Sequence, residues 1–123
     1  MEIIKQKLLS EPFSVDALKL ARAIYFTHLT DGNSLYLEIK LTSVRTLLHL
    51  HSNKETIEKV EHLLRELNEP LAVKNFDFFG KTYPMRFVTF CEYKIDKNII
   101  EVELSEEFLH AESLYMLDSF LTN

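Results

Sequence analysis

The stretch LYLEIKLTSVRTLLHLHSNKETIEKVEHLLRELNE, residues 35–69, decides the fold that this chain is expected to adopt. Residues 35–41 alternate aliphatic and polar side chains, which predicts a strand with one buried face. The apolar residues that follow are spaced as on a helix, so we expect a short helix that Thr42 or Ser43 caps and that ends near Leu50.

A second, longer helix is predicted directly after a polar turn. Ser52 and Glu55 have the spacing of a capping box, so this helix should begin near Asn53. Its apolar face is wide enough to pack against two elements, and its members are Ile57, Val60, Leu63, Leu64 and Leu67. Two helices joined by so short a turn indicate a helix-turn-helix.

The flanking segments complete the predicted order of elements. Ser14 is the expected cap of a helix that runs to Leu29. After Leu71 the hydrophobic period becomes two, which predicts a strand, a turn at residues 79–81, a long strand that alternates from Met85 to Ile95, and a third strand. Ser105 is expected to cap a final helix. This order predicts an α+β winged helix-turn-helix, with a three-helix core and a β-hairpin or small antiparallel sheet.

Composition favours one domain in a reducing compartment. The 123 residues suit a single winged-helix domain at 14–123, preceded by an N-terminal arm or short helix at 1–13. The lone Cys91 and the lack of a signal-peptide pattern or a long apolar run predict a cytoplasmic protein without a membrane partner. The net charge of -5 opposes binding to a polyanion unless the basic residues cluster.

Two segments carry a resemblance to a known family. Residues 41–48, LTSVRTLL, lead into the capped helix from Asn53, and residues 99–108, IIEVELSEEF, resemble a last strand that runs into a Ser-Glu-led helix. In this order the chain resembles one winged-helix half of the plasmid replication initiators, the Rep family that opens iteron origins. Members join two winged helices that bind repeated sites, and the first half is commonly used for dimerisation. The resemblance implies a shortened initiator, an isolated first domain or a stand-alone relative.

The predicted function is DNA binding and dimerisation. In a helix-turn-helix the N-terminal residues of the second helix lie nearest the base edges, and basic residues on the wing meet phosphates. The residues expected to contact double-stranded DNA are Arg45, Asn53, Lys54, Lys59, Lys81 and Arg86. Because acidic residues share the second helix, DNA binding should be weak or need a second domain. We also expect a homodimer.

Two other interpretations of the charges on the second helix are compatible with the sequence. The charges of the second helix could form a solvated face with pairs such as Glu55 with Lys59 and Glu61 with Arg65. Alternatively, that acidic face could bind a basic protein, without any DNA binding. We expect no enzyme, cofactor, metal or small-molecule substrate, because His49 and His51 lack the accompanying ligands of a metal motif and Cys91 should be a buried, inert thiol.

Overall fold

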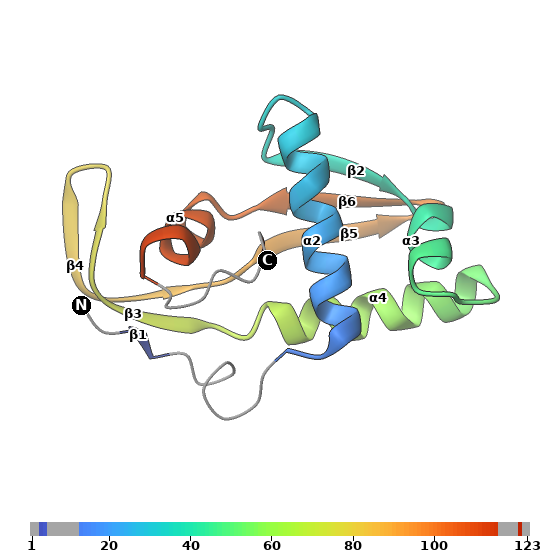
Figure 1. The fold of residues 1–123 in the computed structure, drawn as a ribbon, viewed down its shortest axis with the longest axis horizontal. Coiled ribbons are helices and arrows are strands. Elements are labelled where there is room, and N and C mark those ends of the chain that lie inside the picture. The colour runs from blue at the N-terminus through green and yellow to red at the C-terminus, as the bar shows by residue number, and fades with distance from the viewer. Residues whose placement is uncertain (1–2, 5–12, 116–120, 122–123) are drawn as a thin grey trace.

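A computed structural model describes residues 3–4, 13–115 and 121 of the chain. In chain order the elements are β1 (Ile3–Ile4), α2 (Val15–Thr30), β2 (Tyr36–Lys40), α3 (Leu41–Leu47), α4 (Asn53–Leu67), β3 (Leu71–Phe78), β4 (Lys81–Val88), β5 (Cys91–Asp96), β6 (Ile99–Leu104) and α5 (Glu106–Tyr115). In this described part, the chain is α+β, with helices packed beside two small antiparallel sheets (Figure 1). No helix within it is long and apolar enough to cross a membrane.

The helix caps agree with the predictions at three of four starts. The hydroxyl of Ser14 accepts the N–H of Ala17 at 3.2 Å, and that of Ser52 accepts the N–H of Glu55 at 3.1 Å. Ser105 likewise caps α5. Each bond satisfies a backbone donor that the first helical turn would otherwise leave unpaired.

Helix α3 departs from its predicted bounds. It begins at Leu41, directly at the end of β2, and ends at Leu47. Its cap residue is Lys40, which makes no side-chain capping bond, so the predicted cap at Thr42 or Ser43 is wrong. The N–H of Leu41 is instead satisfied by the carbonyl of Asn98 at 2.8 Å. A backbone group from a distant turn therefore replaces the side-chain cap.

The first sheet has the strand order β2-β6-β5. Leu37 of β2 lies opposite Val102 of β6, which lies opposite Tyr93 of β5. Leu37, Val102 and Ile100 are buried and form the inner face of the sheet. This alternation is why the sequence predicts β2 and β6 close to their observed bounds.

The second sheet has the order β1-β3-β4, and it overturns the prediction of one strand from Met85 to Ile95. That segment divides into β4 and β5, which belong to different sheets. Phe90 lies at the crossing, fully buried, and its carbonyl accepts the N–H of Ser105 at 3.0 Å. Phe90 and Cys91 are both buried, so the alternation of inward and outward side chains breaks at the division.

Strand β1 gives the N-terminal arm its one described element. Ile3 pairs with Val73 and Ile4 pairs with Ala72, so these two residues form a strand on the edge of β3 and not a helix. The remainder of the predicted arm, residues 5–12, lies outside the described residues. Ile3 and Ile4 therefore pair within their own chain.

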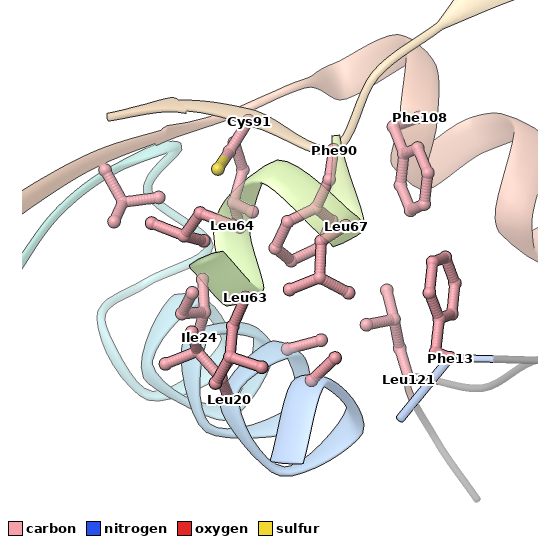
Figure 2. Packing of buried hydrophobic residues seen from close by; sticks show 14 of the residues in the cluster. Phe13, Leu20, Ile24, Leu63, Leu64, Leu67, Phe90, Cys91, Phe108 and Leu121 are labelled. Carbon is pink, nitrogen blue, oxygen red and sulfur yellow. The ribbon is translucent and has the colours of Figure 1, made fainter. Parts of the chain in front are cut away.

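The core lies between the helices and the first sheet. Leu20 and Ile24 of α2 pack on Leu63 of α4, while Leu64 on another side of α4 points toward Cys91 (Figure 2). Helix α5 adds a fourth helix to this core, which corrects the predicted three. Its buried core members are Phe108, Ala111 and Tyr115.

Candidate nucleic-acid interface

The turn between α3 and α4 sets the position of the predicted recognition residues. His49 has a φ of 56°, and the N–H of Leu50 bonds to the carbonyl of Arg45 at 2.9 Å, which ends α3 abruptly. The buried Thr56 donates its hydroxyl to the carbonyl of Ser52 at 2.7 Å. The abrupt end of α3 and the bond from Thr56 to Ser52 thus fix where α4 begins.

Arg45 and Asn53 lie together across this turn. Nη1 of Arg45 donates to Oδ1 of Asn53 at 3.3 Å, which joins α3 to the first residue of α4. Lys54 follows as an exposed residue in the first turn of α4. Three of the six predicted residues therefore gather at one place, where the positive end of the helix dipole adds to their charge.

The β5–β6 turn reaches the same end of the molecule. The bond from Leu41 to the carbonyl of Asn98 holds this turn against the start of α3, beside Lys97 and Lys40. Figure 1 shows α3, the first turn of α4 and the β5–β6 turn together at one end of the long axis. We call the set Lys40, Arg45, Lys54 and Lys97 the basic end. All but Arg45 are exposed, and Arg45 is half-buried.

Sequence reasoning missed Lys40 and Lys97. Lys97 lies in the turn of the β5–β6 hairpin, whose second strand pairs with β2, and this pairing brings the turn to the end of β2 that carries Lys40. Recognising that pairing from sequence requires knowing which of two hairpins returns to the first strand. Two exposed acids, Glu55 and Asp96, lie on the same elements and reduce the net charge of the basic end.

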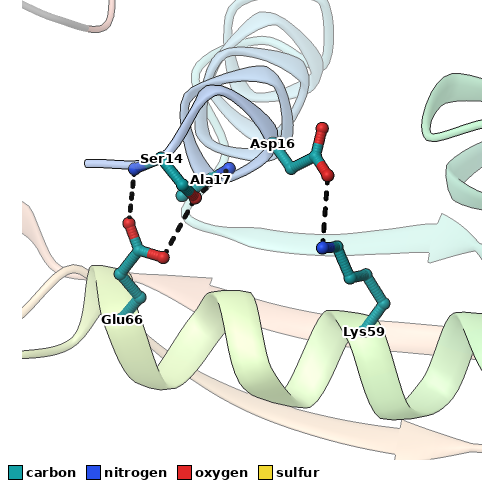
Figure 3. A network of polar contacts seen from close by, with 5 residues as sticks. All are labelled: Ser14, Asp16, Ala17, Lys59 and Glu66. Carbon is teal, nitrogen blue, oxygen red and sulfur yellow. Dashed lines mark hydrogen bonds and ion pairs between the residues drawn. The ribbon is translucent and has the colours of Figure 1, made fainter.

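Lys59 does not join the basic end. Its Nζ lies 3.2 Å from Oδ2 of Asp16, so it links α4 to the first turn of α2 (Figure 3). The predicted pairing of Lys59 with Glu55 is replaced by this contact between helices. The positive charge of Lys59 is therefore offset by Asp16.

Lys81 and Arg86 lie on the other hairpin. The β3–β4 turn is at the end of the molecule opposite the basic end (Figure 1). Arg86 forms a bidentate pair with Glu107 of α5, with Nε to Oε1 at 2.6 Å and Nη2 to Oε2 at 2.9 Å. Its guanidinium also lies 4.8 Å from the ring centroid of Tyr83. These hydrogen bonds raise the pKa of Arg86 and lower that of Glu107.

The acids of α4 have partners within the protein at two positions. Glu66 accepts hydrogen bonds from the N–H and hydroxyl of Ser14, and Glu61 lies 3.5 Å from Arg65, as predicted. The other two acids of α4, Glu55 and Glu58, are exposed.

Histidine and cysteine form no metal site in the described part of the chain, where no group of three or more potential ligands gathers. His49 and His51 are both exposed. Cys91 is buried as predicted, and burial raises its pKa to about 12. Its Sγ accepts a weak bond from Nδ2 of Asn68 at 3.8 Å.

Comparison with known proteins gives no relative from which a role can be transferred. No protein-family model, no curated protein and no solved structure matches the chain.

Proposed function

We propose that the chain is a winged-helix domain that binds double-stranded DNA through the basic end and self-associates through β4. The observation that carries the proposal is the order α2-β2-α3-α4-β5-β6 with the sheet order β2-β6-β5. A winged helix has this order, with a returning strand that pairs with the first one. In this interpretation the wing is the β5–β6 hairpin, and β3–β4 is an additional hairpin.

The basic end fits this role by its position. Asn53 and Lys54, in the first turn of α4, face the base edges of the major groove, as the N-terminal residues of a recognition helix do. The bond from Arg45 to Oδ1 of Asn53 leaves the Asn53 amide nitrogen to donate outward. Lys97 in the wing and Lys40 beside it contact phosphates.

The number of basic side chains that contact phosphates sets the expected salt dependence of DNA binding. If Lys40, Arg45 and Lys97 each neutralise one phosphate, affinity falls about 40-fold between about 50 mM and about 200 mM salt. Specificity from Asn53 and Lys54 alone is limited, which fits a domain that works in pairs. We propose that pairs of this domain occupy repeated sites, as in a plasmid replication initiator.

Self-association is proposed at β4. Strand β3 has β1 on one side and β4 on the other, and no described strand pairs with the second edge of β4. Met85 and Phe87 are exposed there, by 41% and 66%. A second copy that adds its own β4 in antiparallel orientation would pair the open edge and cover these side chains.

The alternative, an acidic α4 that binds a basic protein, has less support. Glu61 and Glu66 are engaged by Arg65 and Ser14, which leaves Glu55 and Glu58 as the exposed acids that α4 would offer to such a partner. This alternative predicts no salt-sensitive DNA binding.

The DNA half of the proposal is tested by anisotropy of a labelled random duplex. Lys54→Gln combined with Lys97→Gln should weaken binding at least about tenfold, because one base-edge contact and one phosphate contact are lost. The matched control is Lys19→Gln combined with Lys81→Gln, which changes net charge equally at exposed positions outside the basic end. Equal loss in both double variants would contradict the assigned face.

The self-association half is tested by sedimentation velocity. Phe87→Lys should shift the protein toward monomer, because it places a charge in the proposed interface. Phe26→Lys is the matched control, since Phe26 of α2 is also 66% exposed. A wild-type protein that stays monomeric at high concentration would overturn the proposed interface and leave the DNA result standing.

A further inference from the structure

One face of the β2-β6-β5 sheet is bare. The side chains that point away from the core on these strands are exposed, except for Glu103, which is half-buried. No described element packs over them. We call this set the outer sheet face, and its members are Tyr36, Glu38, Lys40, Glu92, Lys94, Asp96, Ile99, Glu101 and Glu103.

The outer sheet face is strongly acidic. Five of its nine residues are acidic and two are basic, which gives a local net charge of -3. The imbalance is greatest toward Tyr36 and smallest toward Lys40, at the end that adjoins the basic end. The acidic part of this face therefore lies toward Tyr36, and the face meets the basic end at Lys40, which belongs to both.

Glutamates lie directly opposite each other in this sheet. Glu38 of β2 pairs in register with Glu101 of β6, and Glu103 of β6 pairs with Glu92 of β5. Like charges at directly opposed positions destabilise a sheet. Glu101 also lies opposite Lys94 of β5, which offsets part of this repulsion, whereas the cross-strand neighbours of Glu103 are Tyr36 and Glu92, and neither is basic. The carboxylates of Glu92 and Glu103 are therefore the pair most available to a cation from outside the chain.

The face also has a hollow and an exposed aromatic ring. A groove of about 420 Å³ runs over it, lined by both glutamate pairs, by Tyr36 and by Lys94 as its one basic side chain. Tyr36 is 71% exposed, and the hydrogen bond of its hydroxyl to Glu103 raises its pKa. An exposed ring beside carboxylates offers a cation both a π-face and a counter-charge.

We propose that the outer sheet face is a docking site for an extended, arginine- or lysine-rich segment of a partner protein. The glutamate pairs accept the basic side chains, and Tyr36 stacks on one of them. Nucleic acid is repelled by the same charges. The proposal is independent of the DNA contact and places an acidic protein-binding surface on the sheet and not on α4.

The test uses a fluorescein-labelled peptide of alternating arginine and serine, titrated with the full chain at about 50 mM salt, where charge contacts are least screened. Glu38→Gln combined with Glu92→Gln removes both like-charge pairs and preserves the bond between Tyr36 and Glu103. We expect this double variant to lose about tenfold in peptide affinity. It should also melt at the same or a higher temperature than the wild type, because the repulsion is gone.

The matched control is Glu55→Gln combined with Glu58→Gln, which changes net charge equally at exposed positions on α4. Peptide affinity should change less than about twofold in this control, because only long-range, screened charge is altered. Equal losses in the two double variants, or no peptide binding by the wild type, would overturn the proposal. Either result leaves the separate duplex titration unaffected.

Discussion

Glu66 of α4 accepts two hydrogen bonds from Ser14, one from its N–H at 2.7 Å and one from its hydroxyl at 3.0 Å (Figure 3). The hydroxyl oxygen in turn caps α2 by accepting the N–H of Ala17. One carboxylate therefore fixes the start of α2 on α4, in addition to the apolar packing between the two helices.

Glu66→Ala should lower the free energy of unfolding by about 1 kcal/mol, near the low end for charge-assisted bonds because both bonds are exposed. Urea denaturation measures the change. Glu58→Ala provides the control, since Glu58 is an exposed residue of the same helix. If the two variants were equally stable, the bonds to Ser14 would contribute nothing measurable.

The pair of Arg86 and Glu107 predicts a pH dependence of stability. Hydrogen bonding to Arg86 lowers the pKa of Glu107 in the folded protein. Its contribution is therefore complete above the unfolded value of about 4.3 and is lost as the pH falls through the lowered folded pKa. Wild-type stability should decrease over that acidic window more steeply than that of Glu107→Gln, as measured by urea midpoints at successive pH values.

Arg86→Gln separates the structural role of Arg86 from the DNA contact predicted from sequence. We expect lower stability, because Glu107 loses both hydrogen bonds, and unchanged duplex affinity, because Arg86 lies on the β3–β4 hairpin at the opposite end from α3. If the Arg86→Gln variant were fully folded and still lost DNA affinity, Arg86 would belong to the DNA-binding face.

The buried Cys91 should be unreactive in the folded protein. With a pKa raised to about 12 by burial, its thiolate fraction near pH 8 is about one in ten thousand. A chromogenic thiol reagent should label it only as fast as the protein opens, whereas Ser113→Cys, at an exposed position, should add a site that labels at once. Rapid labelling of native wild type would show that the β5 region opens readily.

The sequence predicted local features of the fold well and the partition of strands poorly. Caps at Ser14 and Ser52 and the period of α4 depend on neighbouring residues, so they are visible in sequence. The alternation from Met85 to Ile95 has the same period in one strand or in two. Only the adjacent burial of Phe90 and Cys91 marks the crossing between sheets, and burial is a tertiary property.

The candidate site was predictable only as far as local charge allows. Asn53 and Lys54 follow from the start of α4, and Arg45 follows from the helix before it. The ion pair of Lys59 with Asp16 was not predictable, because Asp16 comes from a different helix and no pattern within α4 shows that contact. The pair of Arg86 with Glu107 was not predictable for the same reason, since Glu107 belongs to α5.

The tip of the β3–β4 hairpin carries a residue that its backbone disfavours. Phe79 and Gly80 have φ angles of 48° and 77°, both in the left-handed region, between the paired residues Phe78 and Lys81. Two-residue hairpin turns of this kind favour Asn followed by Gly, and other L residues pay about 1 kcal/mol there. The Phe79 side chain is also 79% exposed, although its ring lies 4.5 Å from that of Phe78.

Phe79→Asn should therefore raise the free energy of unfolding by about 0.5 kcal/mol, because the relief of backbone strain exceeds the lost contact of the exposed Phe79 ring with the half-buried Phe78 ring. Phe79→Ala is the control, since alanine loses the ring contact and keeps the strain, so it should be less stable than the wild type. Thermal and urea denaturation of the three proteins rank their stabilities. If Phe79→Asn were no more stable than Phe79→Ala, the ring and not the backbone would govern the stability of this turn.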